Sequence, residues 1–175
     1  MDKILVVIDV QNDFVTGVLG SKEAVEALPY IQEKVNQAVE DRTPIWCTLD
    51  IHYSDYLNTQ EGKNLPIPHC MNQTTGAAPA LKLPSSTNFI AKEQFGSLSL
   101  AQVVEADEIE ICGLVTDICV ITNALLIKTL HSEVPIKIDA RACAGTTPER
   151  HKAALEVMKS CQIEEWYQKH VMDKI

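Results

Sequence analysis

Short apolar runs rich in β-branched residues alternate along the chain with stretches whose apolar residues recur at helical spacing. Five of these runs predict strands, at residues 4–10, 44–50, 88–92, 109–115 and 134–139. Their apolarity is continuous, which indicates strands covered on both faces. Between them, Pro29 is placed to open one helix, and Thr147 with Pro148 supplies the cap and first turn of another. The alternation predicts an α/β fold, with a doubly wound, mostly parallel sheet and helices on both faces.

The chain has 175 residues, of which 46% are hydrophobic, so it is long enough for one well-buried core and too short for two ordinary domains. We therefore expect a single domain over residues 1–175. The longest stretch without clear periodicity runs from about His52 to Ser86. A loop-rich segment of that length in a compact domain is usually functional.

Charge and the N-terminal sequence limit the possible partners. The formal net charge of -9 comes from acidic residues spread along the chain, and no block rich in Lys and Arg offers a footprint for phosphates. The apolar run before Asp9 is too short for a signal-peptide core or a membrane span. We therefore expect a cytoplasmic protein with neither nucleic acid nor membrane as a partner.

Six scattered cysteines form no CxxC pair and lie mostly inside apolar runs. In a chain without an export signal they are expected to be reduced, and at least four of them to be buried as small hydrophobic side chains.

Polar residues at the ends of the predicted strands are the candidates for chemistry, because ligands of an open parallel sheet bind beyond its carboxyl ends. They are Asp9, Gln11 and Asp13 after the first strand, Asp50 and His52 after the second, Lys92 at the third, and Thr116, Asp117 and Cys119 after the fourth. A lone Asp there is usually a helix cap or a turn former. Asp, His, Lys and Cys together at four strand ends make that explanation much weaker.

Cys119 lies where a helix is expected to begin, since apolar residues at helical spacing follow Gly113. The positive end of a helix lowers the pKa of a nearby thiol, and its free N–H groups can stabilise an oxyanion. In this interpretation Asp9 is a base for the thiol and Lys92 is a cation that holds thiolate and carboxylate together. For Cys119 alone, a packed helix residue is the simpler interpretation.

Asp50 and His52 are two residues apart at a strand end, so their side chains point to the same side and can share a metal ion. His69 and Glu61 lie in the aperiodic segment that follows. Carboxylate and imidazole ligands suit zinc, iron or manganese. We therefore expect a divalent metal site, with zinc as the first choice.

Five segments in this order, "VVIDVQNDF", "TLDIH", "PHCMNQTTGA", "AKEQFGSL" and "GLVTDICV", resemble the isochorismatase-like cysteine hydrolases, and within them the nicotinamidase/pyrazinamidase branch. The resemblance covers nearly the whole chain and implies a Rossmann-like three-layer fold. It implies a catalytic triad of Asp9, Lys92 and Cys119, and metal ligands at Asp50, His52 and His69. Glu61 takes the place of an acidic residue that joins those ligands in some members.

The resemblance also places an oxyanion hole at the backbone N–H groups of Val115 and Cys119, next to a cis bond between Leu114 and Val115. Nicotinamidases usually carry Trp near their metal-binding His residues, where this chain has Ile51 and Ile67. The aromatic walls of the substrate pocket are thus reduced to Phe14, Phe95 and Tyr53. The implied reaction is hydrolysis of a small carboxamide to the acid and ammonia through a Cys thioester, in a homo-oligomer.

Other functions stay open. Another branch of the cysteine hydrolases would act on a non-pyridine amide or a ureido compound. A thiol-redox protein would need a second cysteine beside Cys119, and Cys112 lies across a turn. A non-catalytic binding module would not need all three triad residues. A nucleotide-binding Rossmann protein is disfavoured because the first strand leads into "DVQNDF" and not into a glycine-rich turn.

Overall fold

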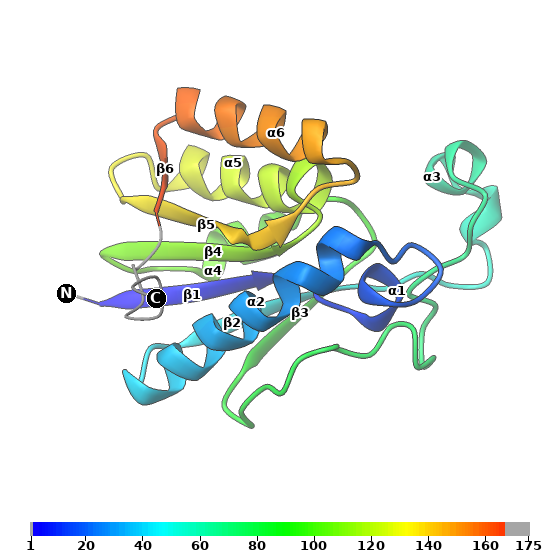
Figure 1. Ribbon diagram of the computed structural model, residues 1–175, viewed down its shortest axis with the longest axis horizontal. Coiled ribbons are helices and arrows are strands. Elements are labelled where there is room, and N and C mark those ends of the chain that lie inside the picture. Colours follow the sequence, from blue (N-terminus) through cyan, green and yellow to red (C-terminus); the bar gives the residue numbers. More distant parts are fainter. Residues whose placement is uncertain (1, 167–175) are drawn as a thin grey trace, which may run out of the picture.

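The computed structural model describes residues 2–166 and has a parallel six-stranded sheet at its centre (Figure 1). The strands are β1 (Lys3–Ile8), β2 (Ile45–Asp50), β3 (Asn88–Lys92), β4 (Glu108–Leu114), β5 (Ile136–Ala144) and β6 (Ile163–Glu165). The helices are α1 (Asn12–Val15), α2 (Lys22–Glu40), α3 (Gln60–Asn64), α4 (Leu98–Val103), α5 (Ile121–Leu130) and α6 (Pro148–Ser160). A 3₁₀ turn at Tyr56–Asn58 precedes α3, and a π-helical turn at Thr116–Val120 precedes α5.

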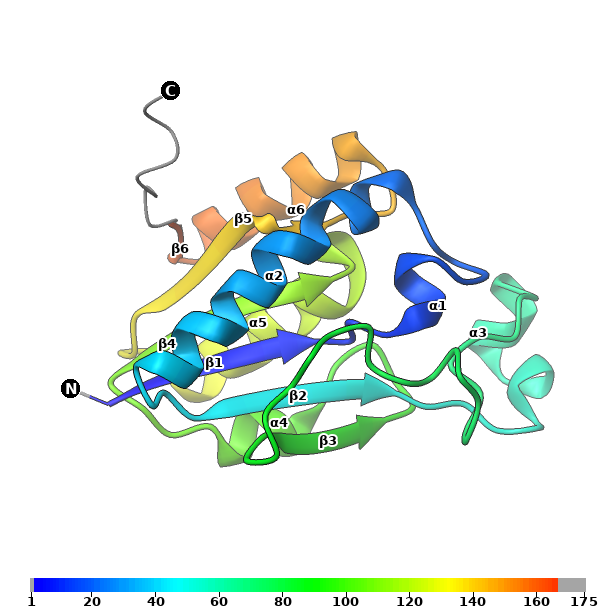
Figure 2. The same cartoon turned by 60° about the horizontal axis from the view of Figure 1, so that its bottom comes forward.

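The strand order is β3-β2-β1-β4-β5-β6, and each neighbouring pair is parallel. In Figure 2, α2 crosses one face of the sheet while α4 and α5 lie behind it, and α6 packs on α5, β5 and β6. The central strands are therefore covered on both sides, and Val6, Val7 and Ile8 of β1 are fully buried. This arrangement confirms the predicted doubly wound α/β fold.

All five predicted strands are present, with ends shifted by up to a few residues and β5 extended to Ala144. The sequence pattern did not predict β6, a three-residue edge strand in which only Ile163 is buried. The prediction that Pro29 opens a helix is wrong, because α2 begins at Lys22 and Pro29 lies inside it. Ser21 caps α2 by accepting a hydrogen bond from the Ala24 N–H at 3.0 Å. That cap stabilises the first turn and offsets part of the cost of the backbone hydrogen bond that Pro29 lacks.

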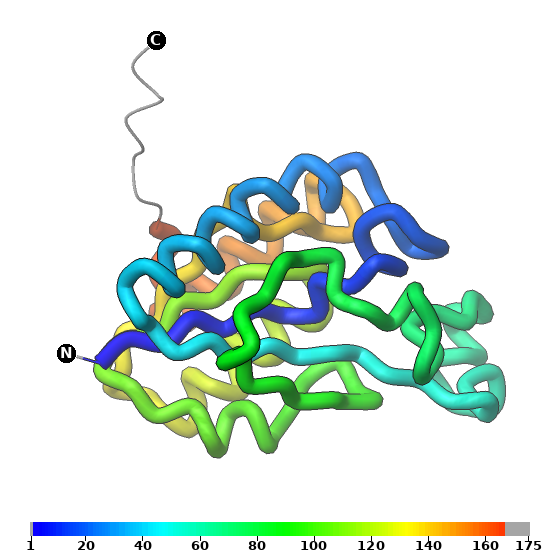
Figure 3. Tube along the Cα trace, turned by 90° about the horizontal axis from the view of Figure 1, so that it is seen from below, coloured from blue at the N-terminus to red at the C-terminus, as the bar shows by residue number. Residues whose placement is uncertain are grey.

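The segment between α3 and β3 carries no helix or strand, yet it is tied to the rest of the fold. It returns the chain from the carboxyl end of the sheet to the start of β3, and Figure 3 shows it in green, crossing β1 and β2. Backbone hydrogen bonds join Asn12 to Ala78 at 2.9 Å and Ala80 to Val10 at 2.9 Å. This attachment fixes the aperiodic segment against the ends of β1 and β2.

No helix within residues 2–166 combines the length and the apolarity needed to cross a membrane. All six cysteines are free thiols, of which five are buried and Cys161 is exposed. The expectation of at least four buried, reduced cysteines is therefore confirmed.

Candidate active site at the carboxyl end of the sheet

The strand order creates a switch point between β1 and β4. The chain leaves β1 toward β2 on one side and leaves β4 toward β5 on the other, which opens a crevice between the two strand ends. Gly113 lets β4 approach β1 closely, since a Cβ atom built there would lie 2.2 Å from the Ile8 carbonyl oxygen. Asp9 directly follows β1 and Cys119 lies in the turn after β4, so both residues lie at this crevice.

Asp9 is fully buried and has a positive φ of 48°, a conformation that Asp tolerates better than most residues. Its Oδ1 accepts a hydrogen bond of 2.6 Å from the Thr48 hydroxyl, and its N–H donates to the Thr48 carbonyl at 3.2 Å. Its Oδ2 lies 2.6 Å from the Lys92 ammonium. Neighbouring strands β2 and β3 thus hold the Asp9 carboxylate in one orientation.

Lys92 contacts both other residues of the predicted triad. Its Nζ lies 3.7 Å from the Cys119 Sγ as well as 2.6 Å from Asp9 Oδ2, and a third neighbour, Asp50 Oδ1, is 3.4 Å away. Cys119 is 6% exposed and Lys92 is 5% exposed. The structure therefore brings Asp9, Lys92 and Cys119 together in a nearly dry site.

The protonation states differ from the expectation for Cys119. Burial raises the pKa of the Cys119 thiol well above its ordinary value, and the Asp9 carboxylate adds to this while Lys92 opposes it. The expected lowering of that pKa by a helix terminus is therefore outweighed. Burial also raises the pKa of Asp9, against the opposing charge of Lys92. Burial alone would lower the pKa of Lys92, but Asp9, Cys119 and Asp50 raise it. The resting site pairs a neutral thiol with an unusually basic carboxylate.

The turn that carries Cys119, Thr116–Val120, is fixed by contacts of Val115 and Thr116. The Leu114–Val115 peptide bond before it is cis, as the resemblance implies, and the Val115 carbonyl accepts hydrogen bonds from the Ile118 and Val120 N–H groups at 3.1 Å each. The Thr116 hydroxyl is hydrogen-bonded to His151 Nδ1 at 2.7 Å. These contacts set the direction in which Cys119 faces the crevice.

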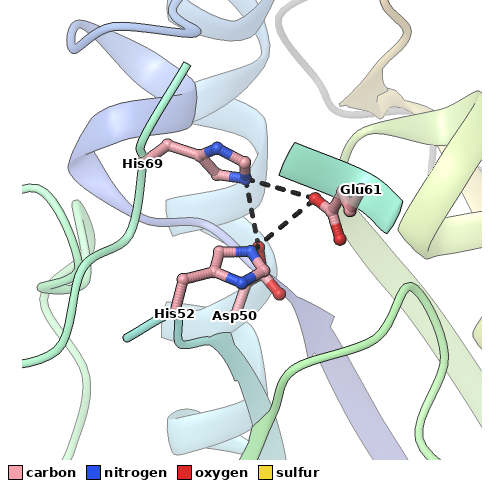
Figure 4. Close-up of side chains that lie close together, drawn as sticks. All are labelled: Asp50, His52, Glu61 and His69. Carbon is pink, nitrogen blue, oxygen red and sulfur yellow. Dashed lines mark hydrogen bonds and ion pairs between the residues drawn. The ribbon is translucent and has the colours of Figure 1, made fainter. Parts of the chain in front are cut away.

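Four side chains near the end of β2 converge on one point. The coordinating atoms of Asp50, His52, Glu61 and His69 all lie within 4.8 Å of one another, and Figure 4 shows the four groups pointing toward a common centre. Asp50 Oδ2 lies 2.9 Å from His52 Nε2 and 3.5 Å from His69 Nε2. Glu61 Oε1 lies 3.7 Å from each of the same nitrogens.

The donor set fits a divalent metal ion. Two imidazole nitrogens and two carboxylates suit Zn²⁺ and also suit iron or manganese. His69 Nδ1 is hydrogen-bonded to the Ile67 carbonyl at 2.8 Å, which places the proton on Nδ1 and leaves the Nε2 lone pair facing the cluster. Without an ion, the negative charges of the Asp50 and Glu61 carboxylates would lie close together in a partly buried site.

Tyr56 organises this cluster, and the sequence did not single it out. Its ring packs against His52 at 4.7 Å and against His69 at 5.2 Å between ring centroids. Its hydroxyl donates to the Leu65 carbonyl at 2.8 Å, and its side chain is almost fully buried. Because burial raises the pKa of Tyr56 to about 12, it stays a neutral donor. An aperiodic segment gives no signal that one of its tyrosines is buried.

Gln11 and Asp13 hold the backbone around the cluster. The Gln11 side chain accepts from the Asp50 N–H at 2.8 Å and donates to the Asp50 carbonyl at 2.8 Å. Asp13 Oδ2 accepts from the Cys70 N–H at 2.8 Å, next to His69. Both residues belong to the first strand-end motif, so their positions were noted from the sequence, but these partners were not.

A cavity of about 510 Å³ is lined by Cys119 of the triad and by Asp50, Glu61 and His69 of the metal cluster. Phe14 and Phe95, two of the three aromatic residues expected around a substrate, line it together with Cys119 and Val115. Tyr53, the third, lines an adjoining cavity of about 670 Å³ that faces His52 and Glu61 from the other side. Tyr53 therefore lines the neighbouring cavity and not the one that contains the thiol.

The model of the isochorismatase domain family matches residues 3–168 of the chain. A comparison with curated protein sequences finds no match.

Solved structures with a similar fold come from several hydrolases. A pyrazinamidase of Pyrococcus horikoshii in complex with zinc is 27% identical, with a TM-score of 0.84 over 96% of this chain and 100% of that one. A nicotinamidase/pyrazinamidase of Bacillus subtilis is 25% identical, with a TM-score of 0.83 over 95% and 100%. An N-carbamoylsarcosine amidase of Thermoplasma acidophilum is 19% identical, with a TM-score of 0.77 over 98% and 99%, and supports the fold alone.

Proposed function

The chain belongs to the isochorismatase domain family, and from this we propose that it is an amidohydrolase that converts a small carboxamide of the nicotinamide or pyrazinamide type to the acid and ammonia. The observation that carries the proposal is the contact of Lys92 with both Asp9 and Cys119 beside a cluster fit for a metal. The zinc-bound pyrazinamidase of Pyrococcus horikoshii, at 27% identity over 96% of the chain, supports it.

In the first half of the reaction Asp9 accepts the thiol proton while the Cys119 sulfur attacks the amide carbon. The high pKa of Cys119 means that proton transfer accompanies attack, and the raised pKa of Asp9 makes the carboxylate a stronger base. The backbone N–H groups of Val115 and Cys119 stabilise the oxyanion. The C–N bond then breaks, and ammonia leaves with the proton that Asp9 returns.

In the second half Asp9 accepts a proton from water, whose oxygen attacks the thioester carbon. The C–S bond breaks, the acid is released, and the proton on Asp9 returns to Cys119. Lys92 stays an ammonium throughout because Asp9, Cys119 and Asp50 raise its pKa. Its charge compensates whichever of the thiolate and the carboxylate is ionised.

Asp50, His52 and His69, with Glu61 as a fourth side chain, would hold the metal ion, with zinc as the first choice. A bound divalent ion supplies a Lewis acid that attracts a ring nitrogen and so orients the substrate. Phe14 and Phe95 line the same cavity, where they would pack against the ring. If nicotinamide is the substrate, the enzyme acts in NAD salvage in the cytoplasm.

Tyr56→Leu is expected to weaken zinc binding by roughly 10- to 100-fold, because it removes the ring that orients His52 and His69 and the anchor on Leu65. Competition with a chromogenic chelator measures the affinity, and the melting temperature of the metal-free protein reports any loss of stability. Tyr53→Leu, on an exposed tyrosine three positions away, serves as the control and should leave the affinity unchanged. Unaltered zinc affinity in Tyr56→Leu would contradict this role.

The proposal is tested by measuring ammonia release from nicotinamide, pyrazinamide, an aliphatic amide and a ureido compound, with the metal removed and restored. We expect metal-dependent turnover of the ring amides with a high Michaelis constant, since each missing aromatic wall costs on the order of 1 kcal/mol of binding. His52→Ala should impair that turnover. Good turnover of the aliphatic or ureido compound, without detectable hydrolysis of either ring amide, would reject the ring-amide assignment.

One observation favours the second candidate, another branch that acts on a non-pyridine amide or a ureido compound. Ile51 and Ile67 stand where the resemblance implies Trp, and Phe14 and Phe95 are the aromatic residues that line the cavity with Cys119. Such a pocket selects less strongly for a flat ring. The same panel of substrates decides between the two candidates.

A further inference from the structure

The cavity over Cys119 extends across the carboxyl ends of five strands. It is lined by Phe95 after β3, Asp50 at β2, Phe14 after β1, Cys119 after β4 and Arg150 in the first turn of α6, after β5. In the strand order β3-β2-β1-β4-β5, the thiol lies near the middle. The metal cluster lies on the β2 side of the thiol, and Arg150 lies on the opposite side.

Arg150 is an exposed residue, and hydrogen bonds through Thr146 and Asp117 link it to the Cys119 turn. Its Nη1 donates to the Thr146 hydroxyl at 3.3 Å. Asp117 Oδ1 accepts from the Thr146 N–H at 2.7 Å and Asp117 Oδ2 accepts from the Thr146 hydroxyl at 2.6 Å. Each Asp117 oxygen thus accepts one hydrogen bond from Thr146, and among the described residues the Arg150 guanidinium has one hydrogen-bond partner for its five N–H donors.

The Asp117 carboxylate lies near Arg150, beyond the Thr146 hydroxyl that both side chains contact, but Arg150 forms no ion pair with it. Within residues 2–166 the hydrogen-bond partner of its guanidinium is the Thr146 hydroxyl and not a carboxylate, although Asp and Glu outnumber Lys and Arg by 24 to 15 in the chain. Among the described residues that line the cavity it is the sole Arg or Lys. The carboxylates of Asp50 and Glu61 belong to the metal cluster on the other side of the thiol.

We propose that Arg150 binds a carboxylate of the substrate, so that the preferred substrates are amides or ureido compounds that also carry a carboxylate group. An arginine fork matches the two oxygens of a carboxylate. With the amide carbon at Cys119, the carboxylate extends toward β5 and away from the metal cluster. This inference rests on amide hydrolysis at Cys119 and narrows the substrate class of the same site.

The kinetic test uses two pairs of amides that differ in one carboxylate, namely nicotinamide with its 5-carboxylate derivative, and butyramide with succinamate. Arg150→Met removes the charge and keeps an apolar stem. We expect wild-type enzyme to prefer the carboxylated member of at least one pair, and Arg150→Met to raise its KM on the order of 10-fold at little changed kcat. The KM for the neutral members should change by less than about two-fold. Arg150→Lys should restore part of the affinity for the carboxylated members.

Lys152→Met is the matched control, because Lys152 is an exposed cation on the same helix and does not line the cavity over Cys119. It should leave both pairs unchanged. An equal effect of Arg150→Met on charged and neutral amides, or no wild-type preference for the charged member of either pair, would overturn the proposal.

A binding measurement separates this proposal from the proposed function. Calorimetric titration of the Cys119→Ala protein with the carboxylated amides gives dissociation constants without turnover. We expect them to rise on the order of 10-fold when Arg150→Met is added. Absence of ammonia release from every amide in wild-type enzyme would reject the hydrolase assignment, whereas unchanged dissociation constants would reject the role of Arg150.

Discussion

Cys119→Ala is expected to lower ammonia release by on the order of 10⁴-fold or more, because the proposed reaction forms its covalent bond at this sulfur. A coupled assay for ammonia measures the loss. In wild-type enzyme quenched during turnover, mass spectrometry should find the substrate mass minus ammonia on the peptide that contains Cys119. That adduct should be absent from the variant.

Cys161→Ala is the control for this experiment, since Cys161 is the exposed cysteine and lies at the end of α6. Its removal should leave turnover unchanged and produce no loss of the acyl adduct. Substantial ammonia release by Cys119→Ala, or an adduct on another cysteine, would show that the thioester has been assigned to the wrong residue.

The sheet could be predicted because its central strands are buried on both faces. A run such as "ILVVIDV" has no polar alternation, and that pattern fits few structures besides a strand between two layers of helices. The edge strand β6 has a single buried residue, Ile163, so hydrophobic pattern gives it almost no signal. The start of α2 was misplaced because Pro29 is a strong first-turn residue, whereas the turns after the observed cap at Ser21 bury only the small side chains of Ala24 and Ala27.

The candidate site could be assembled from strand ends because the strand order of this fold brings polar residues at those ends to one edge. The same reasoning could not give the pKa of Cys119, which depends on burial and on the charge of Asp9 from another strand. It could not find the contacts of Tyr56 with His52 and His69, because an aperiodic segment contains no pattern that reports packing. Arg150 stands on an ordinary helix start, and only the tertiary structure places it in the cavity.

Asp9→Asn is expected to change two properties of the site in opposite directions. Turnover should fall by at least ~10²-fold, because the amide cannot accept the thiol proton. Alkylation of Cys119 by iodoacetamide should become faster at a given pH. The Asp9 charge helps to raise the pKa of the thiol and Lys92 opposes it, so removing the first and keeping the second lowers that pKa. Peptide mapping measures the labelling rate, with exposed Cys161 as an internal reference.

The pH dependence of turnover in wild-type enzyme follows from the pKa of Asp9. Asp9 must be ionised to act as a base, so activity should be lost as the pH falls through its raised pKa, at a higher pH than for an ordinary carboxylate. Asp13→Asn should leave turnover, its pH profile and the labelling rate nearly unchanged, because an amide oxygen still accepts from the Cys70 N–H. Comparable losses of turnover in Asp9→Asn and Asp13→Asn would mean that the two aspartates do not divide into a base and a structural residue. Slower alkylation of Cys119 in Asp9→Asn would show instead that Asp9 activates the resting thiol. That result would contradict the expectation that the Asp9 charge raises the pKa of the thiol.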